Sequence, residues 1–475
     1  MRRTKIICTI GPASREPDML RQLIHSGMDV ARLNFSHGDA TTHRDNVENI
    51  RLASKAEDRA VAIQVDLQGP KFRIGKIIDK GVAVIEGETA SLTTENLTGH
   101  SPKAIPVQNE KFPQLVEKGD HILIDDGLIE LQVLSTIGQE VHCKVLTGGL
   151  VKNNKGINLP GISADLPSMT EKDHEDLAHA LEWNVDWIAL SFVRTADDVE
   201  RLRSKINSLT SRPVPIMAKI EKPEALENID EIIETADAIM VARGDLGIEI
   251  LTEQVPMVQK RIIKRCNEVG IPVVTATQML DSMIRNPRPT RAEASDVANA
   301  ILDGTDALML SGETAIGQYP LKTLQIMDRI ICQVEGEQTE IPVQPFRPLE
   351  ESVNLSIARA VARATRDVVN NLEIAAIIAI TTSGYTAQIV SRYRPRAPII
   401  AITPDQDVQR RLKLYWGVNA LIASRTDNTD EMIANALQTA KKRGLVKKDD
   451  LVVITAGTPE SKPGTTNLLR IHVVH

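Results

Sequence analysis

The sequence predicts an α/β protein with a (β/α)8 TIM barrel, a β-rich domain inserted after the third barrel strand, and an α/β layered domain at the C-terminal end. Three observations support this fold class. Short β-branched runs alternate with amphipathic stretches up to about residue 310. One connection between these runs is far longer than the others, and a proline-containing stretch precedes a second alternating region.

Eight apolar runs have the length and composition of parallel strands that are buried on both faces. The stretches between them have helical patterns. Lys222–Ala236 is one example, with Pro223 in its first turn and acidic residues early, where anions suit the helix dipole. Eight alternating units favour a closed barrel over an open doubly wound sheet. The runs are Lys5–Ile10, Val30–Phe35, Val61–Leu67, Trp187–Phe192, Pro215–Ile220, Ala238–Ala242, Pro272–Thr275 and Ala307–Leu310.

The long connection after the third run has a different sequence pattern from the alternating regions around it. It contains short alternating runs, such as Val82–Ile85 and His121–Ile124, and turn signals at Asp126-Gly127 and Gly148-Gly149. An insertion at this point lies over the C-terminal ends of the barrel strands, where a barrel has its active site, so we expect a lid. The expected domains are a barrel over 1–69 and 170–341 and the insert over 70–169.

The stretch Ile341–Pro348 has the composition of a linker. A long helix, Glu350–Asn371, is expected after it, followed by apolar strands with helices between them. This pattern predicts an α/β layered domain over residues 342–475. Its expected strands are Ile374–Ile380, Ile399–Thr403, Leu451–Thr455 and Leu468–Val474.

Composition excludes several classes of protein. The net charge of −7 and the pI near 5.9 argue against a broad nucleic-acid-binding face. The sequence has no apolar run long enough to span a membrane, and we identify no signal peptide. The four cysteines lie far apart without metal-ligand spacing, which is typical of core thiols in a reducing cytoplasm. A cytoplasmic protein is therefore expected.

Polar side chains follow most of the predicted barrel strands, at the catalytic mouth of a barrel. Lys219 and Glu221 alternate along one strand, so both point to the same side, and Asp245 follows the next strand. Two carboxylates with open coordination positions suit Mg²⁺, and a lysine stabilises a phosphoryl group or an enolate. For Lys219 and Glu221 alone, an interior salt-bridge network is the alternative. The convergence of Arg32 and Thr277 on the same rim favours a metal and anion site.

Longer motifs around these residues resemble the pyruvate kinase family. Met217–Pro223 is similar to the family's signature around its catalytic lysine and metal-binding glutamate, and Met240–Gly247 is similar to its second metal motif. The resemblance covers essentially the whole chain, including the insert and the C-terminal domain. Further similar motifs are Lys5–Pro12, Ala31–Gly38, Ala276–Leu280 and Leu310–Thr314.

The resemblance implies phosphoryl transfer from phosphoenolpyruvate to ADP, which gives pyruvate and ATP in the last step of glycolysis. It implies Glu221 and Asp245 as ligands of Mg²⁺, with Mn²⁺ as an alternative ion. Lys219 would stabilise the transferring phosphoryl group, and Arg32 would contact phosphates.

Other family positions imply how the substrate is held and protonated. The backbone amides of Gly244 and Asp245, with Thr277, would hold the substrate carboxylate. Thr277 and Ser311, with ordered water, would form the relay that protonates the enol, because a lone hydroxyl is too weak an acid.

The nucleotide site is implied by residues of the barrel and of the insert. His37, Arg73 and Lys155 match family positions that face the ADP phosphates, and Asn34 is assigned to the same site. Arg73 and Lys155 flank the expected lid, so lid closure would bring them over the phosphates. For each residue taken alone, a solvated surface position is the alternative.

A second cation site departs from the family's common pattern. Members that need K⁺ hold it with side chains matching Asn34, Ser36 and Asp66 and a carbonyl matching Leu67, and they carry glutamate where this chain has Lys71. At an effective dielectric of about 20, two like charges 4 Å apart repel by about 4 kcal/mol. The combination of Leu67, Lys71 and Ile74 resembles the K⁺-independent branch of the family, which implies activity without K⁺. The alternative is that Lys71 points to solvent.

The C-terminal stretch Thr381–Ala387 resembles the family's effector loop, because hydroxyls and a glycine before a helix can bind phosphate. Thr382, Ser383 and Thr386 are the expected contacts of a phosphorylated effector, which gives this domain a regulatory role. Helix capping is the alternative for these residues. The loop Gly457–Thr466 lacks the tryptophan-containing pattern with which eukaryotic members bind fructose 1,6-bisphosphate, so a different sugar phosphate or AMP is expected. The family also implies a homotetramer.

Two other functions remain open at this point. One is a different Mg²⁺–enolate barrel enzyme, such as an aldolase or lyase acting on pyruvate. It would use the same kind of metal site, but it would not require a lid or His37 and Arg73. A catalytically silent binding protein is the other alternative. The intact set of Lys219, Glu221 and Asp245 argues against it.

Overall fold

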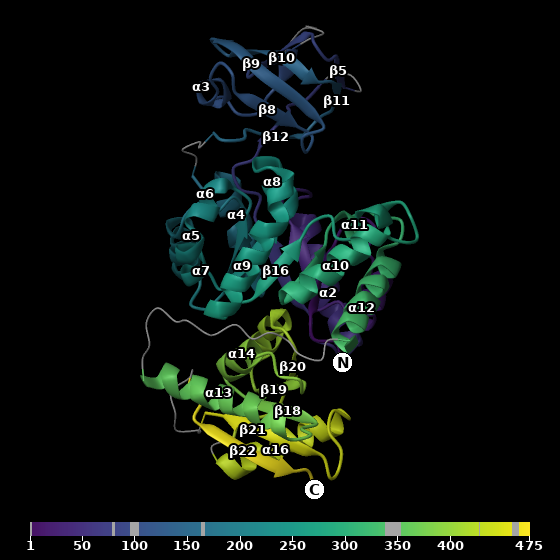
Figure 1. Cartoon of the computed structure of the whole chain (residues 1–475), viewed down its shortest axis with the longest axis vertical. Coiled ribbons are helices and arrows are strands. Elements are labelled where there is room, and N and C mark those ends of the chain that lie inside the picture. Colours follow the sequence, from purple (N-terminus) through teal and green to yellow (C-terminus); the bar gives the residue numbers. More distant parts are fainter. Residues whose placement is uncertain are drawn as a thin grey trace.

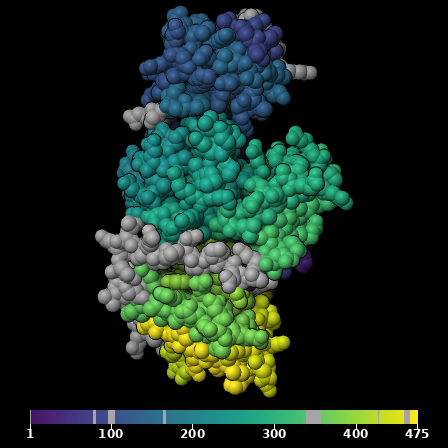
Figure 2. Space-filling view, in the orientation of Figure 1, coloured from purple at the N-terminus to yellow at the C-terminus, as the bar shows by residue number. Residues whose placement is uncertain are grey.

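The computed structural model describes residues 2–77, 81–95, 104–162, 167–337, 353–426, 428–457 and 465–475. The insert, the barrel and the C-terminal domain lie in line, with the barrel in the middle (Figure 1). In the space-filling view the insert projects beyond one end of the barrel (Figure 2). Among the described residues, no helix is long and apolar enough to cross a membrane.

The predicted barrel is confirmed. Eight parallel strands close on themselves, in the order β1-β2-β3-β13-β14-β15-β16-β17. Alternate residues point inward, so Ile7 and Met217 pack inside the barrel while Ile6 and Ile220 pack against the surrounding helices. The strands are β1 (Lys5–Thr9), β2 (Val30–Asn34), β3 (Ala62–Asp66), β13 (Trp187–Leu190), β14 (Ile216–Ile220), β15 (Ala238–Ala242), β16 (Val273–Ala276) and β17 (Ala307–Leu310).

Helices surround the barrel and begin at residues suited to that position. Thr170 caps the first helix after the insert by accepting from the Asp173 amide, and the Asp173 side chain accepts from the Thr170 amide in return. The helices are α1 (Pro17–His25), α2 (Ala40–Ala56), α4 (Glu171–Glu182), α5 (Ala196–Leu209), α6 (Pro223–Glu227), α7 (Ile229–Thr235), α8 (Arg243–Glu249), α9 (Val255–Val269), α10 (Arg291–Asp303), α11 (Gly312–Ala315) and α12 (Pro320–Glu337).

The prediction of one helix over Lys222–Ala236 is wrong, because this stretch forms the two short helices α6 and α7. Asn228 lies between them with φ −101° and ψ 18°. Its side-chain amide donates to the carbonyl oxygens of Arg194 and Glu224, both at 3.0 Å. Such side-chain bonds to nearby backbone compete with continued helix.

The insert has its own apolar core between a seven-stranded sheet, ordered β4-β12-β8-β9-β10-β6-β7, and the pair β11–β5. Asp126-Gly127 lies between β8 and β9, and both residues have positive φ. The predicted Gly148-Gly149 turn is wrong, because this pair leads from β10 into β11, which pairs with β5. A Cβ on Gly148 would lie 2.7 Å from the Val84 carbonyl oxygen, so glycine allows close packing there. The elements are β4 (Phe72–Arg73), β5 (Val82–Val84), β6 (Thr89–Thr93), β7 (Ala104–Pro106), α3 (Phe112–Leu115), β8 (His121–Ile124), β9 (Ile129–Ile137), β10 (Glu140–Thr147), β11 (Gly149–Val151) and β12 (Gly156–Asn158).

The C-terminal domain contains a five-stranded sheet, ordered β20-β19-β18-β21-β22, with β22 antiparallel to β21. The sequence did not predict β20, whose apolar run is interrupted by Asn419. The predicted linker, and most of the loop Gly457–Thr466, lie outside the described residues. The elements are α13 (Val353–Asn371), β18 (Ala376–Ile380), α14 (Tyr385–Arg392), β19 (Ile399–Thr403), α15 (Gln406–Arg411), β20 (Val418–Ile422), α16 (Thr429–Lys442), β21 (Leu451–Ala456) and β22 (Leu468–Val473).

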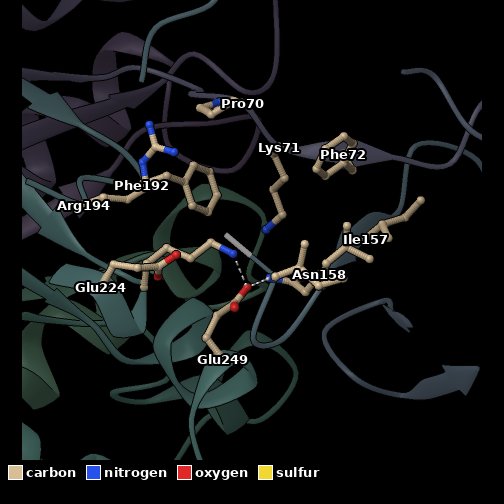
Figure 3. Close-up of a pocket in the computed structure, with 12 residues that line it drawn as sticks. Pro70, Lys71, Phe72, Ile157, Asn158, Phe192, Arg194, Glu224 and Glu249 are labelled. Atoms are coloured by element: carbon tan, nitrogen blue, oxygen red, sulfur yellow. Dashed lines mark hydrogen bonds and ion pairs between the residues drawn. The ribbon is translucent and has the colours of Figure 1, made fainter. Parts of the chain in front are cut away.

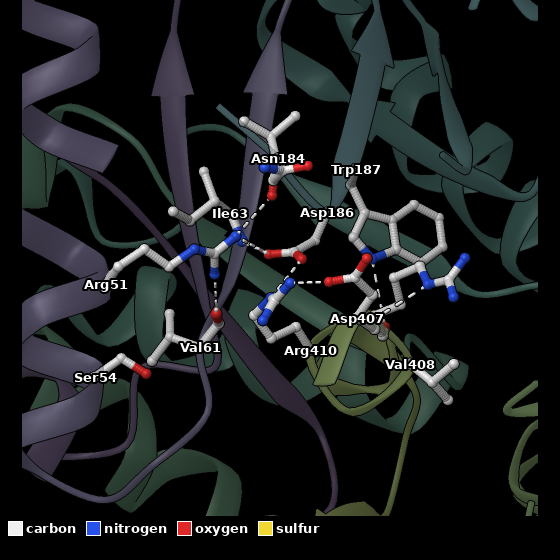
Figure 4. Close-up of polar contacts among 12 residues, drawn as sticks. Arg51, Ser54, Val61, Ile63, Asn184, Asp186, Trp187, Asp407, Val408 and Arg410 are labelled. Carbon is white, nitrogen blue, oxygen red and sulfur yellow. Dashed lines mark hydrogen bonds and ion pairs between the residues drawn. The ribbon is translucent and has the colours of Figure 1, made fainter. Parts of the chain in front are cut away.

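The C-terminal domain docks on the N-terminal ends of the barrel strands. Asp186, directly before β13, is fully buried and accepts from the Ile63 amide at 2.7 Å, Arg51 Nη2 at 2.9 Å and Arg410 Nε at 2.8 Å (Figure 4). Arg51 lies on α2 and Arg410 on α15, so one carboxylate ties a barrel helix, strand β3 and the C-terminal domain together. The opposite end of the barrel faces the insert.

Candidate active site

Polar side chains meet inside the insert-facing end of the barrel, because they occupy inward positions at the C-terminal ends of their strands. Arg32 on β2 donates to Asp66 Oδ2 on β3 through Nε at 2.8 Å and through Nη2 at 2.5 Å. A third bond, from Arg32 Nη1 to Thr9 Oγ1, is 3.0 Å long. Asp66 and Thr9 therefore fix the direction of the guanidinium group.

Lys219 Nζ lies at the centre of this group. It donates to Ser191 Oγ at 2.7 Å and lies 3.2 Å from Asp66 Oδ1 and 3.0 Å from Glu221 Oε1. Burial alone lowers the pKa of Lys219, but the carboxylates of Asp66 and Glu221 outweigh burial and raise this pKa above its usual range. Burial likewise raises the pKa of Asp66, but Lys219 and Arg32 lower it below its usual range. The site thus holds a lysine that stays charged.

Glu221 is fully buried, and its two oxygens are bonded differently. The Phe192 amide donates to Oε2 at 2.7 Å, whereas Oε1 pairs with Lys219 Nζ at 3.0 Å but accepts no hydrogen bond among the described residues. Burial raises the pKa of Glu221, Lys219 opposes this shift, and Asp245 adds to it. A carboxylate oxygen that accepts no hydrogen bond and is met by an ion pair, next to a second carboxylate, fits the oxygen ligands that Mg²⁺ takes.

The predicted metal site consists of two carboxylates, those of Glu221 and Asp245. In the described ranges, no group of three or more His, Cys, Asp or Glu side chains is placed to hold a metal ion. Glu221 and Asp245 would therefore leave further coordination positions to substrate oxygens and water, as Mg²⁺ prefers.

Lys71 reaches Asp245 from the side of the insert. Its Nζ lies 2.7 Å from Asp245 Oδ1 and 5.9 Å from the centre of the Phe192 ring. Burial raises the pKa of Asp245, but Lys71 and Lys219 outweigh it and lower this pKa below its usual range. Lys71 thus adds a further cation to Arg32 and Lys219 in the site.

Three of the four predicted K⁺ ligands, Asn34, Asp66 and Leu67, have an oxygen atom that already accepts a hydrogen bond. The Leu67 carbonyl accepts from Ser191 Oγ at 2.8 Å, and Asn34 Oδ1 accepts from the Ser36 amide at 3.2 Å. Asp66 accepts from Arg32 as described above. Within the described part of the chain, no hydrogen bond or ion pair joins Lys71 to these oxygens.

The chain turns sharply where Thr277 follows β16. Thr277 has a φ of +71°, and its hydroxyl donates to the Ala276 carbonyl at 2.6 Å and accepts from the Gly244 amide at 2.7 Å. Arg243 donates to the Thr277 carbonyl at 2.8 Å and pairs with Asp296 through two contacts of 2.7 Å. The hydroxyl is therefore held beside the first turn of α8 by a strained but well-supported backbone.

A cleft of about 290 Å³ opens between the barrel mouth and the insert. It brings together most residues that the sequence predicted, from both domains. Asp66, Leu67, Gly244, Thr277 and Ser311 do not belong to its lining. The predicted residues that line it are Arg32, Asn34, Ser36, His37, Lys71, Arg73, Lys155, Lys219, Glu221 and Asp245.

The predicted nucleotide residues surround the outer part of this cleft. Arg73 Nη1 donates to the Asn154 carbonyl at 3.1 Å, and Lys155 Nζ lies 2.7 Å from Asp125 Oδ1. Burial and the nearby Arg73 guanidinium lower the pKa of His37 below its usual range. The cleft is thus rich in positive charge, which suits an anionic ligand.

Sequence reasoning missed Ser191 and Thr9. Ser191 directly follows β13 (Trp187–Leu190), but it lay inside the predicted run Trp187–Phe192, so the rule that found the other strand ends passed over it. Thr9 ends β1 and lies inside a motif noted for its resemblance only.

The predicted effector residues differ in exposure. Thr382 and Ser383 are exposed before α14, whereas Thr386 is buried and bonds to Thr466 Oγ1 at 2.9 Å. The Gly384 amide donates to Thr381 Oγ1 at 2.9 Å, so part of this loop is internally bonded.

Known proteins resemble this chain over its whole length. Residues 1–324 match the pyruvate kinase barrel domain, and residues 359–472 match the pyruvate kinase alpha/beta domain. Pyruvate kinase from Geobacillus stearothermophilus is 48% identical over 477 residues, which cover 100% of this chain and 80% of the relative. Pyruvate kinase from Staphylococcus aureus (strain MRSA252) is 45% identical, with 100% and 81% covered. A crystal structure of a pyruvate kinase from Cryptosporidium parvum has a TM-score of 0.90 and 38% identity, with 100% and 96% covered.

Proposed function

This chain belongs to the pyruvate kinase family, and we propose that the cleft between barrel and insert is where it transfers a phosphoryl group from phosphoenolpyruvate to ADP. That reaction, which needs Mg²⁺ and gives pyruvate and ATP, is the last step of glycolysis. The observation that carries the assignment is Lys219, a charged lysine between Asp66 and Glu221 on the wall of the cleft.

Glu221 and Asp245 are the proposed ligands of Mg²⁺, with Mn²⁺ as an alternative. Glu221 Oε1, which accepts no hydrogen bond from the described residues and is paired with Lys219, supports this assignment. An ion held there by Glu221 and Asp245 would supply positive charge to offset the negative charge that develops during transfer. Lys219 would stabilise the phosphoryl group during its transfer. Arg32, whose direction is fixed by Asp66, would contact phosphate oxygens.

The substrate carboxylate is assigned to the Gly244 and Asp245 amides and to Thr277. In this structure the Gly244 amide bonds to Thr277 Oγ1, so substrate binding would exchange this bond for one to the carboxylate. After transfer, the enol must gain a proton on carbon. Thr277 and Ser311 would pass it through ordered water, because a hydroxyl alone is too weak an acid.

ADP is assigned to the insert side of the cleft, with contacts from His37, Arg73, Lys155 and Asn34. These residues come from both domains, so closure of the insert as a lid would bring the phosphates of ADP towards Lys219 and keep water out. The proposed limits are 1–69 and 170–341 for the barrel, 70–169 for the lid and 342–475 for the C-terminal domain.

Activity without K⁺ is part of this proposal. Lys71 supplies a fixed cation in the cleft, and oxygens of Asn34, Asp66 and Leu67, three of the four predicted K⁺ ligands, accept bonds from the protein itself. Initial rates with KCl should equal those with tetramethylammonium chloride at the same ionic strength. Strong activation by KCl alone would contradict K⁺ independence and leave the other assignments intact.

A phosphorylated effector is assigned to the exposed hydroxyls of Thr382 and Ser383, with Thr386 beside them. Titration calorimetry with sugar phosphates and AMP should show a binder whose affinity falls in Ser383→Asp. Equal affinity in both proteins would refute this site. We also assign the chain to the cytoplasm.

A homotetramer is the proposed assembly. An open groove between α10 and α12 is lined by apolar residues, among them Ala294, Ala298, Ile326, Ile330 and Val334, and such a surface suits contact with another copy of the chain. Light scattering after size-exclusion chromatography should give four times the 52.2 kDa chain mass. A monomeric mass would refute this assembly.

The experiment that tests the function is a coupled assay of pyruvate formation. Turnover should require phosphoenolpyruvate, ADP and Mg²⁺ together. Pyruvate formation without ADP would favour a lyase or aldolase on the same barrel and would contradict the proposal.

A further inference from the structure

Helix α8 is held to the insert at two points. Lys71 Nζ contacts Asp245 Oδ1 at 2.7 Å, and Asn158 Nδ2, on β12, donates to Glu249 Oε1 at 3.1 Å. Asp245 and Glu249 are four residues apart, so they share one face of the helix. Lys71 and Asn158 belong to neighbouring segments, because β12 pairs with β4, which follows Lys71. We call these four residues the hinge clamp.

The Asn158–Glu249 bond is buried, with exposed fractions of 5% for Asn158 and 8% for Glu249. Figure 3 shows the two side chains facing each other. Lys222 Nζ lies 2.8 Å from the same Glu249 oxygen and balances its charge. Turning the Asn158 amide over would place its oxygen against the carboxylate. The bond to Glu249 therefore fixes the amide, although Asn158 Oδ1 has no partner among the described residues.

Both connections between barrel and insert pass beside this bond. The chain enters the insert through Pro70–Phe72, and the segment Ile157–Leu159 lies on the return path. Both segments line a cavity of about 50 Å³ next to Glu249 (Figure 3). Since side chains do not fill this space, the hinge has room to change shape.

We propose that the hinge clamp sets the position of the lid over the cleft, with Glu249 as a positioning residue. The proposal rests on the proposed function, in which Asp245 binds metal and Arg73 and Lys155 bind nucleotide. Asn158 and Glu249 touch no proposed ligand, so their bond holds the lid to α8 while Lys71 and Asp245 serve the reaction. The Asn158–Glu249 bond, at the C-terminal end of α8, would thereby set where the lid lies relative to Asp245 in the first turn of the same helix.

The test exchanges the chemical roles of the two side chains. Asn158→Asp places a second carboxylate against Glu249, and the double variant Asn158→Asp with Glu249→Gln restores one amide and one carboxylate at the original total charge. Hydrogen exchange of residues 69–74 and 156–160, measured without metal or substrates, should be about tenfold faster in the single variant, the change expected for losing one charge-assisted bond. The double variant should return towards wild type. The KM for ADP should follow the same order, with kcat changing less.

Glu130→Gln is the matched control, because Glu130 pairs with His121 at 2.7 Å within the insert and lines neither cavity. Its exchange at both hinge segments should equal that of wild type. If Asn158→Asp does not fold, Asn158→Ala takes its place. Wild-type exchange in the single variant, or no recovery in the double variant, would overturn the clamp. Absence of turnover in a wild-type protein with the expected exchange pattern would instead refute the proposed function and leave the clamp standing.

Discussion

Two buried lysines at opposite ends of the barrel show how surroundings decide what a charged group does. Lys219, at the mouth, lies between Asp66 and Glu221, and they raise its pKa above the usual range. Lys5, at the base, donates to the Val418 carbonyl at 2.7 Å, and burial lowers its pKa to about 8. The exposed fractions are similar, 8% and 6%. The mouth therefore keeps a lysine charged for a ligand, and the base uses one to join two domains.

The N-terminal end of the barrel differs from the mouth in a second way, which is how its central carboxylate, Asp186, is hydrogen-bonded. Both oxygens of Asp186 accept hydrogen bonds from the protein, whereas Glu221 Oε1 accepts none from the described residues and contacts Lys219 as an ion pair. A charge that is fully bonded by the protein stabilises the fold. One that is incompletely bonded is available to a ligand.

The largest expected effect is on turnover when the charge at the mouth is removed. Lys219→Met should lower kcat by about a thousandfold or more, because the transferring phosphoryl group loses its positive partner, and it should leave the fold and Mg²⁺ binding largely intact. Steady-state kinetics and circular dichroism measure both. Lys260→Met, on the outer helix layer, should behave as wild type. Near-normal turnover in Lys219→Met would remove this lysine from the mechanism.

The next largest effect is on stability, when the ion pairs at the N-terminal end of the barrel are removed. Asp186→Asn leaves Arg51 and Arg410 without their carboxylate and should weaken the attachment of the C-terminal domain by about 3 kcal/mol, as for other buried pairs that lose one partner. Urea unfolding followed by tryptophan fluorescence would report it, since Trp187 lies at this junction and donates to the Arg411 carbonyl. Asp303→Asn, on the outer helix layer, is the control, and equal loss in both variants would contradict the role of Asp186.

A smaller effect is the pH dependence of stability that the lowered pKa of Lys5 should cause. Lys5 has a folded pKa of about 8 and a value of 10.5 when unperturbed, so between these pH values the unfolded chain binds a proton that the folded chain does not. Stability relative to Lys5→Met should therefore rise with pH, by at most about 1.4 kcal/mol per pH unit from pH 8 to 10. Unfolding midpoints of both proteins across this range measure the difference. A flat difference would show that Lys5 stays charged in the fold.

The sequence was sufficient for those features that local pattern controls. The eight runs became the eight barrel strands, and the strand-end rule placed Arg32, Lys219 and Glu221 in one cleft. Alternation along a strand is what sets the inward direction of these side chains, so it could be read in advance.

Contacts between distant segments could not be read from the sequence. Asn228 splits a predicted helix because Arg194, from another connection, offers it a carbonyl. The contact of Lys71 with Asp245 depends on how the insert lies over the barrel. Neither local pattern nor resemblance to a family contains that geometry.

The central claim is that Glu221 holds the divalent cation at the mouth. Its buried Oε1 accepts no hydrogen bond from the described residues and contacts Lys219 as an ion pair. Titration calorimetry with Mn²⁺ tests it most directly, in wild type, Glu221→Gln and Asp303→Asn. The account predicts one site per chain in wild type and in Asp303→Asn, and at least a tenfold loss of affinity in Glu221→Gln, as when a metal site loses a ligand or its support. Equal Mn²⁺ affinity in all three proteins would contradict it.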